Sequence, residues 1–177
     1  DGGAIFTDSD ELANLLKSIR IHGKGTEKYD NVRIGLNSRL DTIQAAILLP
    51  KLTAFKEYEL QKRNEIAYQY TEALKDKYNT PFVSANMQSS GAQYTLLLNS
   101  EEERNALQRK LKEHDIPSMI YYPKPLHLQT CYKSLGYSKG CFVNAEKASK
   151  CVLSLPMSPL VDGNDLEEIC KVLNSGK

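Results

Sequence analysis

Residues 34–48 read Ile34-Gly35-Leu36-Asn37-Ser38-Arg39-Leu40-Asp41-Thr42-Ile43-Gln44-Ala45-Ala46-Ile47-Leu48, a polar loop that runs into an apolar helix. Free backbone N–H groups and the helix dipole favour an anion at such a junction. Arg39 adds a fork of donors that suits phosphate or carboxylate. On local chemistry alone, the alternative is an ordinary helix cap beside a surface arginine. The stretch therefore predicts a helix start and a candidate anion site.

The helical pattern continues from about Ser38, where Ser38 and Asp41 form a candidate capping box, to about Lys77. Pro50 lies inside it and predicts either a bent helix or two helices that meet there, because a proline disrupts the helical hydrogen bonds. The polar stretch 56–63 is typical of a solvent-exposed connector between domains. We place the domain boundary there, with residues 1–55 in one part and residues 56–177 in the other.

The first part of the chain combines a short apolar run, a helical stripe and a loop. Residues 4–7 predict a strand, and Asp8 with Glu11 predicts a cap for the next helix. That helix carries a stripe of apolar residues that we expect to be buried: Leu12, Leu15, Leu16 and Ile19. Gly23 can end it, and residues 23–37 form a loop long enough to suggest a functional role.

The second part predicts a small α+β domain. Strands are expected at 92–98, 116–122 and 153–155, and helices at 100–114 and 144–152. A last helix is expected after Asn164 as its cap, with four residues facing inward: Leu166, Ile169, Cys170 and Leu173.

Composition limits the class of protein. The 177 residues carry a net charge of +1 and are 41% apolar, which allows a packed core and gives no reason to expect a nucleic acid or a membrane as partner. No signal-peptide pattern or long apolar run is found. Four cysteines without C-x-x-C pairs suggest reduced thiols in a cytoplasmic protein. The chain does not begin with Met, which favours excision from a longer chain.

Metal binding is not expected. His127 and Cys131 are four residues apart and would share a face on a helix, but two ligands do not make a site. No P-loop, G-x-S-x-G or H-E-x-x-H pattern is present.

Three segments carry a resemblance to a known family. Gly35–Ala46 resembles the G-x-N-x-R…Q-A-A segment of the pyridoxal phosphate-dependent sugar aminotransferases of the DegT/DnrJ/EryC1/StrS family. Ile116–Gln129 resembles the family segment that ends in H-Y-P-x-P-L-H-x-Q, except that Tyr121 replaces the common histidine and Asp115 replaces the glycine that usually precedes Ile116. Val152–Pro159 resembles its L-S-L-P-M-x-P segment.

The resemblance implies an α/β parent of fold type I, like aspartate aminotransferase. Residues 1–55 would be the end of its large cofactor-binding domain with the start of the connecting helix, and residues 56–177 its small C-terminal α+β domain. The lysine that forms the Schiff base would lie upstream of the Asp1-Gly2-Gly3-Ala4 turn, so no lysine of this chain is assigned a catalytic role.

The resemblance also implies site residues and partners. Asn37 would bind the cofactor phosphate across a homodimer interface, so that active sites are shared. Arg39, Tyr121 and His127 would lie near the substrate, although a histidine that holds a proline-rich turn is an equal alternative for His127. A tyrosine at position 121 can donate a hydrogen bond but cannot act as a base near neutral pH.

The expected reaction is transfer of an amino group from glutamate to a keto nucleotide sugar, most similar to a UDP-linked 3-keto sugar, in surface-polysaccharide or amino-sugar biosynthesis. Two alternatives stay open. One is a sugar dehydratase on the same fold, with histidine at the upstream lysine position. The other is a noncatalytic module for dimerisation or regulation.

Overall fold

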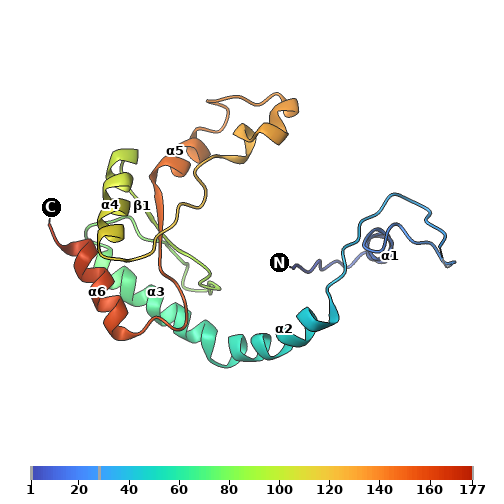
Figure 1. Cartoon of the computed structure of the whole chain (residues 1–177), viewed down its shortest axis with the longest axis horizontal. Coiled ribbons are helices and arrows are strands. Elements are labelled where there is room, and N and C mark those ends of the chain that lie inside the picture. The colour runs from blue at the N-terminus through green and yellow to red at the C-terminus, as the bar shows by residue number, and fades with distance from the viewer. Residues whose placement is uncertain (1, 28, 177) are drawn as a thin grey trace. The chain divides into compact units, whose positions relative to one another are not determined.

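The computed structural model describes residues 2–27 and 29–176, so the predicted turn that starts at Asp1 begins outside the described residues. The chain divides into two compact units, residues 1–54 and residues 55–177. Figure 1 labels the α-helices of both units and strand β1 of the second. None of the helices in the described part of the chain has both the length and the apolar composition needed to cross a lipid bilayer.

The first unit contains the helices α1 (Asp10–Ile19) and α2 (Thr42–Ala54). The N-cap of α1 is Ser9, whose side chain accepts from the N–H of Leu12, so the prediction of Asp8 as the cap was wrong by one residue. The strand predicted at 4–7 is absent, because those described residues have no partner strand. Leu12 and Leu15 are exposed and the buried stripe is not formed, since no other described element of this unit packs on that face.

Helix α2 begins later than the sequence predicts. The backbone N–H of Ser38 donates to the carbonyl of Arg20 at 3.0 Å, which holds residue 38 outside the helix. The first helical bond runs instead from Ala45 N to the carbonyl of Asp41. A continuous helical run then passes Pro50 into a π-helical segment, η1 (Phe55–Glu59), and on into α3 (Leu60–Leu74). Pro50 therefore does not divide the helix, because it removes a single bond among good helix formers.

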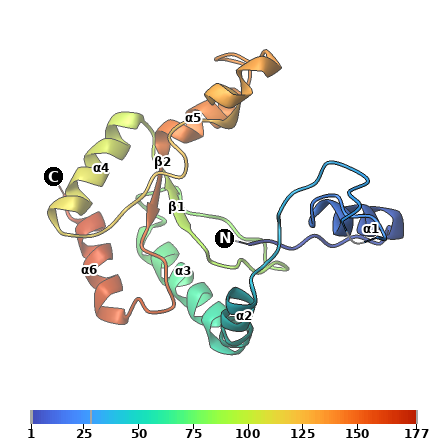
Figure 2. The ribbon, with the colours of Figure 1, turned by 45° about the vertical axis from the view of Figure 1, so that its right-hand side comes forward.

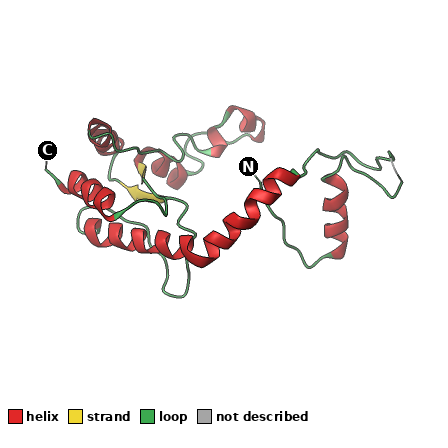
Figure 3. Cartoon of the chain, turned by 60° about the horizontal axis from the view of Figure 1, so that its bottom comes forward, coloured by secondary structure: helices red, strands yellow, loops and turns green. Residues whose placement is uncertain are grey.

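The second unit packs helices against one face of a short sheet. Strands β1 (Tyr94–Leu97) and β2 (Val152–Leu155) are antiparallel, with Tyr94 opposite Leu155. Helices α4 (Glu101–Glu113) and α6 (Gly163–Asn174) lie side by side along this strand pair, and α6 also contacts α3 (Figure 2). The sheet is small beside the helices (Figure 3).

The core of this unit lies between the strands and the three helices. The side chains with almost no exposed surface are Tyr70, Leu74, Tyr94, Leu96, Leu111, Leu153 and Leu173. The inward set predicted for the last helix is confirmed, since Leu166, Ile169, Cys170 and Leu173 are all buried. The cap of α6 is Asp162 rather than Asn164, because the chain forms a reciprocal capping box between Asp162 and Asp165.

The remaining segments carry the candidate site. The strand predicted at 116–122 is reduced to an isolated bridge between Met119 and Ser154, since Pro117 lacks an N–H for a longer ladder. Two 3₁₀ turns, η2 (Leu126–Leu128) and η3 (Thr130–Leu135), lead to helix α5 (Val143–Cys151), close to the helix predicted at 144–152.

Candidate functional site

The loop before α2 is held against the end of α1 by glycine packing. A Cβ atom at Gly35 would lie 2.0 Å from the backbone nitrogen of Gly23, and one at Gly23 would lie 1.8 Å from the carbonyl oxygen of Arg33. Gly23 also has φ +74°, a left-handed conformation that side chains other than glycine rarely adopt. These close approaches require glycine at both positions and fix the path of the loop.

Backbone hydrogen bonds then place the candidate residues. The N–H of Leu36 donates to the carbonyl of Ile19 at 2.7 Å, and its own carbonyl accepts from the N–H of His22 at 2.9 Å. Asn37 forms an isolated antiparallel bridge with Ile21. The backbone of residues 36–38 is therefore ordered, although the side chain of Asn37 is exposed.

Asn37 and Arg39 are brought together as a pair. The Nε of Arg39 donates to the Oδ1 of Asn37 at 3.0 Å, on the exposed surface. Because Oδ1 accepts this bond, the amide Nδ2 remains available as a donor. The pair thus presents an amide donor beside a guanidinium, a donor set that fits phosphate or carboxylate oxygens.

Tyr121 and His127 line one groove of the second unit. The groove has a volume of about 650 Å³ and lies between the segment 121–129 and helix α5. Its walls are mainly aromatic and aliphatic, with Lys124, Gln129 and Ser149 as polar members. Tyr121 is 40% exposed, and its ring meets that of Tyr122 edge-on with centroids 5.5 Å apart. It also borders a second hollow of about 310 Å³, which contains Gln93 and Ser154.

His127 is anchored by a carboxylate. Its Nε2 lies 3.0 Å from the Oε1 of Glu146, and its ring contacts that of Phe142 in a tilted arrangement with centroids 4.8 Å apart. The same Oε1 accepts from the N–H of Gly140 at 2.7 Å. The Gly140 N–H first, and His127 after it, hold the pKa of Glu146 below its usual value, so the carboxylate is charged near neutral pH.

Glu146 was not identified from the sequence. It lies 19 residues after His127, a separation with no helical or strand period, and only the predicted helix at 144–152 placed it near any element. The i,i+4 pairing of His127 with Cys131 is not realised, since the two residues lie on separate 3₁₀ turns. Among the described residues there is no group of three or more potential metal ligands.

The four predicted site residues thus form two pairs. Asn37 and Arg39 lie in the first unit, and Tyr121 and His127 in the second. The first pair presents an amide and a guanidinium. In the second, the Tyr121 phenol is partly exposed, whereas the His127 ring lines the groove with its Nε2 bonded to Glu146. Taken separately, the donors of the first unit suit an anion, and the largely apolar groove of the second unit suits a ring-containing ligand.

The chain belongs to the DegT/DnrJ/EryC1/StrS aminotransferase family, whose model matches residues 1–174. A curated relative, UDP-2-acetamido-2-deoxy-3-oxo-D-glucuronate aminotransferase of Pseudomonas aeruginosa, is 41% identical over 99% of the chain and 47% of the relative. The resemblance inferred from the motifs is thereby confirmed. The chain spans about half the length of the curated relatives that it matches.

Solved structures of the family share the fold. A DegT/DnrJ/EryC1/StrS aminotransferase from Brucella abortus is 47% identical, with a TM-score of 0.85 over 95% of this chain and 44% of that one. DesV of S. venezuelae, solved in complex with a ketimine intermediate, is 27% identical with a TM-score of 0.84 over 94% and 44%. These neighbours are aminotransferases of this family, which have the fold type I architecture of pyridoxal phosphate enzymes.

Proposed function

We propose that this chain is the C-terminal part of a pyridoxal phosphate-dependent aminotransferase that moves the amino group of glutamate onto a UDP-linked 3-keto sugar, for surface-polysaccharide or amino-sugar biosynthesis. The observation that carries the proposal is the 41% identity over nearly the whole chain to an aminotransferase named for such a substrate. The coverage of about half of that relative supports the view that further chain completes the enzyme.

The residues present fit the phosphate of the cofactor. Arg39 holds Oδ1 of Asn37, which leaves the Asn37 amide N–H to donate to a phosphate oxygen. Both side chains are exposed at the end of a loop that glycine packing orders, so little rearrangement is needed to receive an anion. Pyridoxal phosphate, when bound, would supply the electron sink for amino-group transfer.

The other residues have binding roles. The guanidinium of Arg39 would pair with a carboxylate or phosphate of the substrate. The Tyr121 phenol, exposed between two hollows, would donate a hydrogen bond to a sugar hydroxyl or carboxylate. His127 contributes an imidazole whose orientation Glu146 sets, so its ring forms a rigid part of the groove wall.

A homodimer with shared active sites is part of the proposal. Helix α2 has no buried residue, and its large apolar side chains are 42–76% exposed: Ile43, Ile47, Leu48, Leu49 and Leu52. A helix that is apolar over most of its surface requires burial against further protein. The partner subunit and the remainder of the enzyme are the proposed sources of that cover.

The test is amino-group transfer by the protein as its gene encodes it, loaded with pyridoxal phosphate and given glutamate and a UDP-linked 3-keto sugar. We expect one 2-oxoglutarate for each aminated sugar. Loss of water from the sugar without 2-oxoglutarate would instead establish the dehydratase. A protein that does not bind pyridoxal phosphate at all would support the third interpretation, a noncatalytic module.

The isolated 177 residues are expected to show no turnover in the same assay. None of their lysines matches the family position that holds the cofactor, and the cofactor cannot transfer an amino group without that attachment and its proton transfers. Glutamate-dependent amination by these residues alone would contradict the proposed division of the enzyme.

A further inference from the structure

The carboxylate of Glu146 joins three segments that lie apart in the sequence. Glu146 lies in the first turn of α5. Its Oε1 accepts a hydrogen bond from the N–H of Gly140, in the loop before α5, at 2.7 Å. The same oxygen lies 3.0 Å from the Nε2 of His127, which belongs to η2. Its side chain is only 13% exposed, and that of His127 is 7% exposed. One carboxylate oxygen therefore ties η2 and the loop to the helix.

The segments that Glu146 joins form the walls of the groove. His127 and Phe142 both line the groove, and their rings are in contact, tilted by 58° with centroids 4.8 Å apart. Phe142 is supported in turn by Tyr137, at 5.1 Å edge-on. Glu146 is not among the lining residues, so it acts on the groove only through the side chains that it orients.

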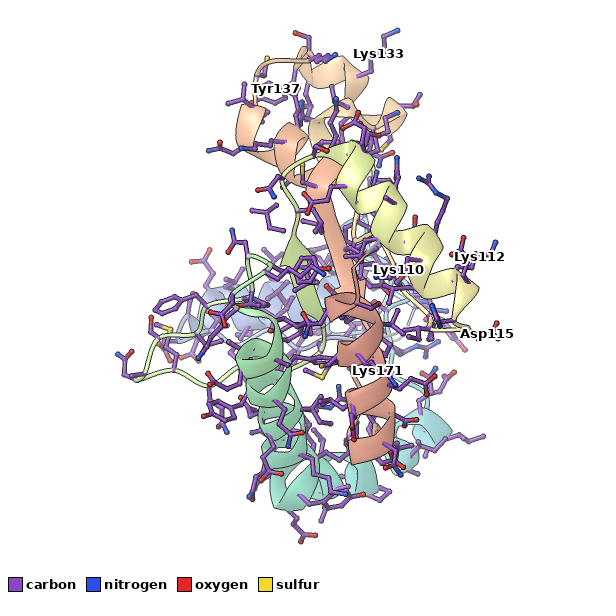
Figure 4. The ribbon with its side chains drawn as sticks, turned by 90° about the vertical axis from the view of Figure 1, so that its left-hand side faces the viewer. Lys110, Lys112, Asp115, Lys133, Tyr137 and Lys171 are labelled. Atoms are coloured by element: carbon purple, nitrogen blue, oxygen red, sulfur yellow. The ribbon has the colours of Figure 1, made fainter. Side chains whose placement is uncertain are left out.

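Little else in the described structure holds this segment. No residue from 121 to 142 belongs to the hydrophobic core of the unit, which lies mainly on α3, α4, α6 and the strands. Lys133 and Tyr137 lie at the end of the unit far from Lys171 of α6 (Figure 4). The conformation of the segment therefore depends on a few polar bonds, of which those to Glu146 involve a charged acceptor and are the stronger kind.

We propose that Glu146 is a positioning residue that fixes the groove wall formed by His127 and Phe142 for the nucleotide-sugar substrate. This role rests on the proposed function. Loss of the carboxylate would release Gly140 and His127 together, and the groove would lose its preformed shape. Binding of the sugar nucleotide would then include the cost of ordering the segment.

The experiment compares Glu146→Ala and Glu146→Gln with wild type in the cofactor-loaded protein as its gene encodes it. Glu168→Ala and Glu168→Gln, on the exposed side of α6, are the matched controls. We expect Glu146→Ala to raise KM for the nucleotide sugar about tenfold, because bonds to a charged group are lost. For the same variant we expect kcat, and KM for glutamate, to stay within about twofold of wild type. Glu146→Gln should be intermediate, since its amide oxygen can still accept from Gly140.

Hydrogen exchange of the backbone amides of residues 126–142 tests whether Glu146 orders this segment, independently of whether that order aids substrate binding. We expect faster exchange there in Glu146→Ala, with exchange in α3, α4 and α6 unchanged. An unchanged KM for the nucleotide sugar, or equal losses in kcat and both KM values with a lowered melting temperature, would overturn the positioning role. A wild-type protein without any turnover would overturn the proposed function, and with it the role of Glu146 in substrate binding. Hydrogen exchange would then test only whether Glu146 holds the segment in place.

Discussion

Tyr70 is a buried residue whose hydroxyl group forms a hydrogen bond within the second unit. The ring has no exposed surface and lies 5.0 Å from that of Tyr94, and its hydroxyl group donates to the carbonyl of Pro156 at 3.0 Å. Burial raises the pKa of Tyr70, so the phenol stays neutral and keeps this bond. The bond links α3 to the turn that follows β2, the turn that borders the second hollow.

Tyr70→Phe is expected to lower the free energy of unfolding by about 0.5–1.5 kcal/mol, because the partly buried Pro156 carbonyl would lose its donor. Urea denaturation followed by circular dichroism measures the change. Tyr68→Phe, at a residue 66% exposed on the same helix, is the control and should change stability by less than about 0.5 kcal/mol. Equal effects of the two changes would show that the Pro156 bond contributes nothing.

Arg39→Ala is expected to lower kcat/KM of the cofactor-loaded enzyme by at least about tenfold, because a guanidinium donor to substrate and the orientation of Asn37 are lost together. Steady-state amino transfer measures it. Arg109→Ala, at an exposed arginine on α4, should leave kcat/KM near wild type. A wild-type value in Arg39→Ala would exclude Arg39 from the site.

Helix ends show how local signals compete. At α4 the cap is Ser100, whose side chain accepts from the N–H of Glu103 at 3.2 Å, at the start of the helix predicted at 100–114. At α6 four consecutive residues could serve, Asp162-Gly163-Asn164-Asp165, and the reciprocal bonds of Asp162 and Asp165 decide the start. The sequence therefore located both helices, and the exact first residue depended on which side chain could reach a backbone N–H.

Asp162→Ala is expected to destabilise the protein by about 0.5–2 kcal/mol, because the N–H of Asp165 loses its acceptor at the helix start. Asn164→Ala provides the comparison and should cost less than about 0.5 kcal/mol, since its exposed side chain caps nothing in the structure. Thermal unfolding of both variants measures the difference. A larger loss in Asn164→Ala would place the cap where the sequence predicted it.

For the whole molecule, burial is distributed unequally between the two units. The second unit has a continuous core on one side of its strands, whereas the described residues of the first unit bury no large apolar side chain. The first unit is held by backbone bonds and glycine packing at the end of α1. Its apolar surface is the physical reason to expect that it is completed by further protein.

The four cysteines provide a test of the fold as a whole. Cys131 and Cys141 are exposed, whereas Cys151 and Cys170 are buried, and burial raises the pKa of the Cys170 thiol. A thiol-specific reagent should therefore label the first two quickly in the native protein and the other two only after denaturation, because the thiolate is the reactive form. Rapid native labelling of Cys170, mapped by peptide mass spectrometry, would contradict the packing of α6.

The sequence by itself determined the family, the helical run past residue 42, most helices of the second unit and the inward face of α6. These features are encoded by motifs and by periodic patterns within a few residues. Only the tertiary structure decided that the stripe of α1 is exposed, that residues 116–122 pair at a single position, and that His127 meets Glu146. Such outcomes depend on which surfaces pack together, and residues 19 apart leave no local pattern of their contact.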